Sequence, residues 1–143
     1  MKREVLLELK SFIDANGEQQ EIEITTRGNL LLRDSAIFVS YKETEQNGFD
    51  GCTVLIKAEG EERVSVGRSG GGQSQLLIER GKRNLCSYHT PYGMIMMGVT
   101  GGSVKNELDS RGLGELSFSY ELDVNMELIS KNRLVIKIRE SKN

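Results

Sequence analysis

The sequence predicts an all-β protein that folds as a closed or nearly closed antiparallel β-barrel of about ten strands. Three observations lead to this fold class. Apolar residues recur at every second position almost wherever a period can be measured, which is typical of strands with one buried face. Turn-forming residues separate these runs about every ten positions. Together the runs leave little of the 143-residue chain for helices.

The first two predicted strands form a hairpin. One covers residues 5–10, where Leu6 interrupts the alternation, and the other covers residues 21–25. Between them lies the pair Asn16-Gly17, and Asn-Gly is the favoured centre of a type I′ turn because both residues accept a positive φ. We therefore expect these two strands to be neighbours in the sheet.

The rest of the chain is predicted to continue as a meander of sequential strands. Turn residues punctuate it at residues 46–48, 58–61 and 90–93. The clearest alternation lies in residues 115–124, where five apolar or aromatic side chains alternate with five polar ones. The other strands are expected at residues 30–33, 36–42, 53–58, 63–66, 75–79, 85–89, 94–100 and 134–139.

At most one short helix is expected, at residues 103–109. Ser103 is a suitable N-cap, and Val104 and Leu108 would share one helix face at the i, i+4 spacing. A helix of this length is not stable alone, so it would depend on packing against the sheet.

The predicted strands have to bury their apolar stripes without leaving long exposed edges. Closing the sheet into a barrel achieves both. A two-sheet sandwich fits the same pattern, and periodicity alone does not separate the two architectures. The chain has the length of one domain, so we expect a single β-barrel domain over residues 1–143.

Composition argues against several classes of protein. The net charge of -2 and the isoelectric point near 5.6 lack the basic excess of phosphate binders, so no nucleic-acid partner is expected. No apolar run approaches the length of a membrane span, and the first residues lack the apolar core of a signal peptide. We therefore expect a cytoplasmic protein. Cys52 and Cys86 form no Cys-x-x-Cys motif, which favours two buried, reduced thiols.

The sequence offers little support for catalysis, and an enzyme is the less favoured class. The single histidine, His89, lies three positions from Cys86, and strict alternation would put the two side chains on opposite faces. No serine sits in a Gly-x-Ser-x-Gly motif, and residues 67–71 come nearest to one. No catalytic residue is therefore predicted.

Phosphate and metal sites are not expected either. The glycine-rich residues 67–72 lack the Lys-Ser/Thr ending and the following helix of a phosphate-binding loop, which favours a flexible hairpin loop. The sequence contains neither an acidic calcium-type loop nor a His-x-x-x-His pair. We expect no metal and no cofactor.

The candidate ligand-binding residues are long polar or aromatic side chains within the predicted inward stripes. They are Arg68, Arg80, Tyr88, Tyr92 and Tyr120. In a small barrel, an inward Arg or Tyr either is satisfied by an internal network, which is the commoner case, or is available to a ligand. The neighbouring run Met94-Ile95-Met96-Met97 suits a core and also an adaptable apolar pocket.

Short motifs in a fixed order resemble one known family. They are Arg68-Ser69-Gly70 after a valine-rich strand, Tyr88-x-x-x-Tyr92-Gly93 before an apolar strand, and Gly-Glu-Leu-Ser-Phe-Ser-Tyr at residues 114–120. Together they make nearly the whole chain similar to the YwiB-like family of small bacterial proteins of unknown function. Members of that family adopt a lipocalin-like or calycin-like β-barrel, so the resemblance implies the barrel that periodicity also predicts. It implies no catalytic residues.

The sequence leaves two functions open. The first is a non-enzymatic barrel that binds a small apolar or amphipathic ligand in its interior, close to the inward Arg and Tyr residues. The second is a structural or interaction module with a side-chain-filled barrel, whose partner is another protein or a second copy of the chain. A pocket with convergent polar groups would favour the first, and an exposed apolar patch would favour the second.

Overall fold

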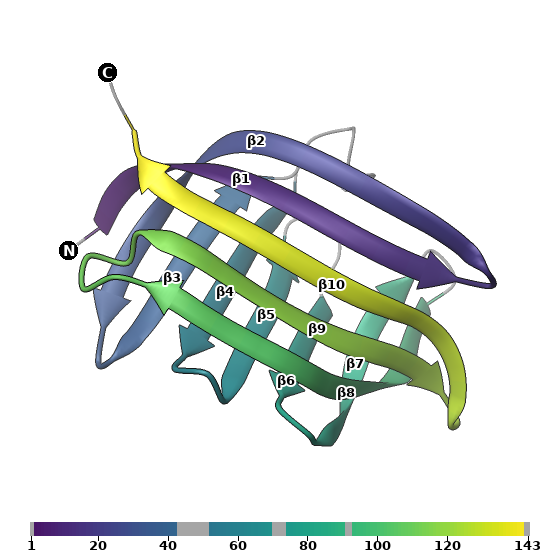
Figure 1. The fold of residues 1–143 in the computed structure, drawn as a ribbon. Coiled ribbons are helices and arrows are strands. Elements are labelled where there is room, and N and C mark those ends of the chain that lie inside the picture. The colour runs from purple at the N-terminus through teal and green to yellow at the C-terminus, as the bar shows by residue number, and fades with distance from the viewer. Residues whose placement is uncertain (1, 43–51, 70–73, 91–92, 142–143) are drawn as a thin grey trace.

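The computed structural model describes residues 2–42, 52–69, 74–90 and 93–141, and these residues form ten strands and no helix (Figure 1). The all-β prediction is therefore confirmed. The strands are β1 (Lys2–Ala15), β2 (Glu18–Arg33), β3 (Ala36–Lys42), β4 (Thr53–Glu59), β5 (Arg63–Ser69), β6 (Ser74–Glu79), β7 (Arg83–Thr90), β8 (Gly93–Leu108), β9 (Gly114–Val124) and β10 (Glu127–Glu140).

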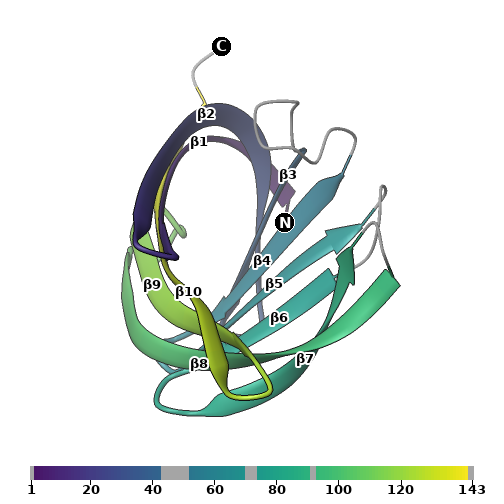
Figure 2. The ribbon, with the colours of Figure 1, turned by 90° about the vertical axis from the view of Figure 1, so that its right-hand side faces the viewer.

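All ten strands belong to one antiparallel sheet, in the order β6-β5-β4-β3-β2-β1-β10-β9-β8-β7. Strands that follow one another in the chain are neighbours, except β6 and β7, which are the two ends of the sheet. The pairing of β1 with β10 joins the two halves of the chain. The long strands curve over β3 to β6, and the sheet wraps around one interior (Figures 1 and 2). The nearly closed barrel is thus confirmed over the sandwich.

Strand β2 is longer than the sequence predicted. Residues 21–25 and 30–33, expected as two strands, form one continuous strand that pairs with β1. Gly28 lies between the two predicted strands, and glycine generally weakens a strand interior. In the structure, Gly28 lies against the Leu7 side chain and the Ser40 carbonyl, and a Cβ at this position would overlap both. Glycine is therefore required by close packing, and the strand continues through it.

The predicted helix at residues 103–109 is wrong, because these residues form the second half of β8. Val104 and Leu108 are four positions apart, and an even spacing also puts two residues on one face of a strand. The Ser103 backbone N–H donates to Ser119 Oγ at 2.9 Å, where the register between β8 and β9 shifts at a β-bulge. Ser103 thus stabilises a bulge and caps no helix.

The first hairpin has the predicted turn. Asn16 and Gly17 both have positive φ, 54° and 77°, and Ala15 pairs with Glu18 across the turn. The turn at residues 58–61 is also confirmed, since Gly60 has a φ of 61° between β4 and β5. Residues 46–48 lie outside the described residues, as do Pro91 and Tyr92 of the turn between β7 and β8.

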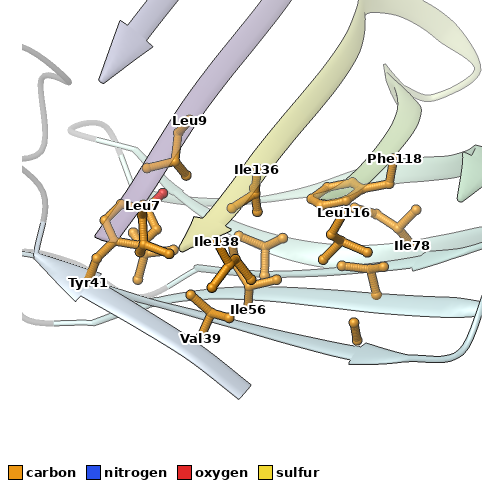
Figure 3. Close-up of a cluster of buried hydrophobic side chains, with 14 of the residues drawn as sticks. Leu7, Leu9, Val39, Tyr41, Ile56, Ile78, Leu116, Phe118, Ile136 and Ile138 are labelled. Carbon is orange, nitrogen blue, oxygen red and sulfur yellow. The ribbon is translucent and has the colours of Figure 1, made fainter. Parts of the chain in front are cut away.

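The hydrophobic core lies where β1, β9 and β10 cross over β3 to β6 (Figure 3). Leu7, Phe118 and Ile136 point down into it, and Val39 and Ile56 point up from the strands below. All five side chains are at most 1% exposed. Burying a side chain of this size stabilises the fold by roughly 1.5–3 kcal/mol, so this crossing is the main source of stability.

The barrel closes at a seam between β6 and β7, the two ends of the sheet. Side chains of β7 form hydrogen bonds with the β6 backbone there. The Leu77 N–H donates to Cys86 Sγ at 3.4 Å, and Asn84 Nδ2 donates to the Leu77 carbonyl at 3.4 Å and to Glu79 Oε1 at 3.2 Å. Cys52 and Cys86 are both buried free thiols, as the sequence predicted.

Candidate functional site

The inward side of the barrel has a packed zone and a half-buried zone. In the packed zone, inward side chains such as Leu7, Leu116 and Ile136 are fully buried. Farther along the same strands, toward the β1–β2 and β9–β10 turns, most inward apolar side chains are only half-buried, whereas Ser130 is buried. We call six of them the inner face: Ile13, Ile22, Ile24, Tyr120, Leu122 and Leu134.

Strand register brings the inner face together. Leu9, which belongs to the buried core, pairs with Ile24. The next inward row contains Ile22 of β2 and Leu134 of β10, which both pair with Ser11 of β1. Because side chains two positions apart point to the same face of a strand, these residues continue the core stripe outward. The strands that carry them curve around a common interior (Figure 2).

Polar groups lie within this apolar face. Asn132 of β10 pairs with Tyr120 of β9, and Ser130 pairs with Leu122 one row farther along. Asn132 Nδ2 donates to Ser130 Oγ at 2.9 Å. The Tyr120 ring stacks on Phe118 with 6.2 Å between ring centroids, which fixes the ring against the core. The arrangement offers an apolar surface with an amide, an aliphatic hydroxyl and a phenol on two adjacent strands.

The structure places one of the five predicted site residues, Tyr120, on the inner face. Arg68 lies near the end of β5, opposite Val54 and Ser74, and is half-buried. Arg80 follows the end of β6 and is exposed, with its backbone N–H bound to the Glu62 carbonyl.

The other two predicted residues are not assigned to the inner face. Tyr88 pairs with Ile95 in β7 and β8, but its side chain lies outside the described residues, as does the His89 side chain. Tyr92 lies outside them altogether. Cys86 accepts its hydrogen bond from the Leu77 N–H, so its thiol has a structural partner.

Sequence reasoning missed Asn132 and Ser130. The stripe predicted at residues 134–139 contains Leu134, Ile136 and Ile138, and the same period continues backward to Asn132. A polar residue in register with an apolar stripe was therefore a usable signal. The strand predicted at residues 134–139 began too late to include Asn132, whereas β10 begins at Glu127.

On the outer face, Arg83 of β7 and Asp123 of β9 form a two-bond ion pair across β8. Arg83 Nε and Nη2 donate to the two Asp123 oxygens at 3.0 and 2.6 Å. Gly98 lies directly beneath, and a Cβ there would overlap both charged groups. The hydrogen bond from Arg83 holds the pKa of Asp123 below its usual range, and the Met126 N–H adds a smaller effect in the same direction. This ion pair links β7 to β9 across the intervening strand β8.

A groove of about 790 Å³ lies beside Leu6 of β1, the end of β10 and the loop between β8 and β9. Three apolar side chains line it, Leu6, Leu113 and Ile138. Charged groups near it bind one another: Arg111 contacts Glu140 at 3.0 Å and Asp109 at 3.4 Å, and Arg27 contacts Glu4 at 3.6 Å. Because these charges are paired, we do not assign the groove to an ionic ligand.

Apolar side chains are exposed on the outer face of β7 and β8. Leu85, Met94 and Met96 are 63%, 56% and 56% exposed, whereas Met97 is buried. The predicted methionine cluster is thus divided between surface and core. Within the described residues, His, Cys, Asp and Glu side chains form no group of three suited to a metal ion. Nor does the described part of the chain contain a helix long and apolar enough to cross a membrane.

Comparison with known proteins identifies relatives over most of the chain. The curated protein "Uncharacterized beta-barrel protein YwiB" of Bacillus subtilis (strain 168) is 29% identical over 129 residues, which cover 89% of this chain and 88% of that protein. The crystal structure of the ywiB protein from Bacillus subtilis superposes with a TM-score of 0.76 at 20% identity, covering 99% of this chain and 94% of that one. This structural likeness supports the fold.

The family described as "Domain of unknown function (DUF1934)" matches residues 7–136, which include most of the core, the inner face and the seam. The resemblance to YwiB-like proteins, inferred from short motifs, is confirmed by these matches. The chain therefore belongs to the DUF1934 family of β-barrel proteins.

Proposed function

We propose that this protein is a non-enzymatic, calycin-like binding protein of the cytoplasm, whose ligand is a small amphipathic molecule held on the inner face. The observation that carries the proposal is the incomplete burial of inward apolar side chains in one zone of the barrel. Ile22, Ile24 and Leu134 continue the stripe of the core yet remain half-buried. A ligand that covers them gains hydrophobic free energy, on the order of 25 cal/mol per Å² of apolar surface removed from water.

The polar groups beside the inner face indicate the chemistry of the ligand's polar end. Asn132, Ser130 and Tyr120 lie on adjacent strands, and hydroxyl and amide groups both donate and accept hydrogen bonds. None of the three carries a charge at neutral pH, so they suit an uncharged polar end such as a hydroxyl, amide or carbonyl. A cytoplasmic location is supported by the two reduced thiols, because unpaired cysteines are typical of reducing compartments.

The experiment is native mass spectrometry of the protein isolated gently from its own cells, repeated after denaturation. We expect a small adduct that is present in the native spectrum and lost on denaturation. Ile22→Trp should remove it by filling the inner face, and Asn132→Leu should weaken it by removing the amide. Leu85→Trp, which adds the same side chain on the outer face, is the matched control and should keep the adduct.

A bare chain in the native spectrum would count against a ligand. An adduct that survives Ile22→Trp would show that the ligand binds elsewhere on the protein.

A further inference from the structure

Exposed apolar side chains gather on the outer face around the ion pair of Arg83 and Asp123. Strand register puts Leu85, Gly98, Asp123 and Leu128 in one row across β7, β8, β9 and β10. Residues directly opposite one another in an antiparallel sheet point to the same face, so the two leucines lie at the two ends of this row. They are 63% and 53% exposed. The glycine between them leaves the space that the arginine side chain occupies.

Two exposed methionines border the row. Met96 lies two positions before Gly98 on β8, so it shares the outer face, and it is 56% exposed. Met126 lies in the β9–β10 turn, where its backbone N–H donates to Asp123 Oδ2 at 3.0 Å, and it is 75% exposed. We call these four exposed apolar residues the outer patch: Leu85, Met96, Met126 and Leu128.

The backbone of Met126 indicates that its exposed side chain has a role. Asn125 and Met126 both have positive φ, 51° and 71°, in the two-residue turn between Val124 and Glu127. The second position of such a type I′ turn favours glycine, because a positive φ strains a residue with a Cβ. The first hairpin has Gly17 at this position. A contact between the methionine side chain and a partner explains why the strained residue is present.

The charges in and around the outer patch are balanced. Arg83 and Asp123 neutralise each other, and in the next row Glu121 lies directly opposite Lys131. Glu127 precedes the patch leucine on β10, so its side chain points to the other face of the strand. The patch and its ion pair therefore carry no net charge. An apolar, neutral surface of this kind is typical of contacts between protein chains.

The direction of the ion pair favours a second copy of the chain as the partner. The guanidinium reaches in from the β7 side, and the carboxylate stands on β9. When two copies pack face to face about a two-fold axis parallel to the strands, the axis exchanges the β7 and β9 sides. Each guanidinium then lies over the carboxylate of the other copy, which is an attraction. A two-fold axis across the strands would instead place like charges over one another.

We propose that the outer patch is the interface of a homodimer related by a two-fold axis parallel to these strands. Because this axis also exchanges the ends of the row, Leu85 packs on the partner's Leu128. The Asp123 and Arg83 side chains are already only 12% and 33% exposed, so covering them displaces little further water. This inference goes beyond the ligand of the inner face, since it rests on side chains of the opposite face of the sheet.

The test is sedimentation velocity of the purified protein over a range of concentrations. We expect the wild-type protein to dimerise, and Leu85→Glu and Leu128→Lys each to weaken dimerisation by at least about tenfold, because each buries a charge against a leucine. Leu32→Lys is the matched control, since this leucine of β2 is 39% exposed and lies outside the outer patch. It should leave the dimer unchanged.

Mixing the two patch variants tests the orientation of the copies. An equimolar mixture of Leu85→Glu and Leu128→Lys should form a heterodimer that is tighter than the dimer of either variant. In the heterodimer, the introduced glutamate lies over the introduced lysine, and the other contact keeps its two leucines. An axis across the strands would give no such gain, because equivalent positions would then face each other.

Met126→Gly separates binding from folding. It should weaken dimerisation and raise the urea midpoint of the monomer, because glycine relieves the strained φ. A wild-type protein that remains monomeric at every concentration would overturn the proposal. So would patch variants that dimerise as tightly as the wild-type protein, or a mixture no tighter than its components. None of these results depends on a ligand adduct, so the two proposals fail independently.

Discussion

At the scale of single residues, Gly98 has the most specific role that the structure reveals. It leaves the space through which Arg83 of β7 reaches Asp123 of β9. We expect Gly98→Ala to lower the free energy of unfolding by about 1–3 kcal/mol, the usual effect of forcing extra volume into a packed position. The measurement is urea denaturation.

Gly67→Ala is the matched control for this prediction. Gly67 also lies in a strand, and the nearest atom to a Cβ there is the Leu55 carbonyl oxygen at 4.0 Å. This substitution should leave stability unchanged or raise it slightly, because alanine restricts the unfolded chain. If the two variants unfold at the same urea concentration, Gly98 is not needed for the ion pair.

The same ion pair predicts how stability depends on pH. The Arg83 hydrogen bond lowers the pKa of Asp123 below its ordinary value of 3.8, so the folded protein favours the ionised carboxylate. The stabilisation is fully present above that value and is lost as the pH falls through the lowered pKa. We expect the urea midpoint to fall as the pH is lowered below about 4.

Asp123→Asn tests this origin, since it removes the titrating group and keeps the size of the side chain. The variant should be less stable at neutral pH and should lose less stability on acidification. Asp109 titrates in the same direction, because the Leu113 and Arg111 N–H groups lower its pKa, so part of the pH dependence will remain. If the urea midpoint of Asp123→Asn falls with pH as steeply as that of the wild-type protein, the pH dependence comes from other carboxylates.

At the scale of the elements, the seam between β6 and β7 is held by side chains of β7. We expect Cys86→Ala to speed hydrogen exchange at the Leu77 amide, because its acceptor is lost. Leaving a buried N–H unsatisfied costs about 1–3 kcal/mol. Nuclear magnetic resonance of the Leu77 amide provides the measurement.

Cys86→Ser and Cys52→Ala are the comparisons for the seam. The serine keeps an acceptor atom and should retain more of the protection at Leu77. Cys52 is also buried, so Cys52→Ala removes the same sulfur volume away from the seam and should leave the Leu77 amide unaffected. Equally fast exchange in the serine and alanine variants would show that the thiol contributes by packing alone.

The strands were largely predictable, because in a strand with one buried face apolar and polar residues alternate along the sequence. Residues 115–124 and 36–42 show this most clearly, since both agree closely with β9 and β3. Errors arose where one local signal fits two structures. The four-residue spacing of Val104 and Leu108 fits a helix and a strand, and only the pairing of β8 with β9 decides between them. Gly28 separates two runs in the sequence, and only the packing of Leu7 against it in the structure explains a glycine inside a continuous strand.

The candidate site was much less predictable than the strands. Tyr120 was found because it continues an apolar stripe, whereas its neighbours Asn132 and Ser130 come from another strand. Their proximity depends on the register between β9 and β10, which includes a shift between Leu128 and Ser130. A register shift moves side chains from one face to the other, and the sequence does not encode it in any period.

At the scale of the whole molecule, stability and the proposed functions occupy different parts of the barrel. The core is densest where the long strands cross β3 to β6 (Figure 3). The inner face lies farther along the same strands. Substitutions such as Ile22→Trp therefore act on binding without removing atoms from the main core, which is why they are suited to the experiments above.

The adjacency of β1 and β10 has a topological consequence. The two ends of the sheet, β6 and β7, are consecutive in the chain, whereas Val5 of β1 is paired with Glu140 of β10. If the strands are read from β7 through β10 and then from β1 through β6, every strand lies beside the one before it. The fold is thus a circular permutation of an uninterrupted ten-strand meander. In that permutation, the seam is where the chain would begin and end.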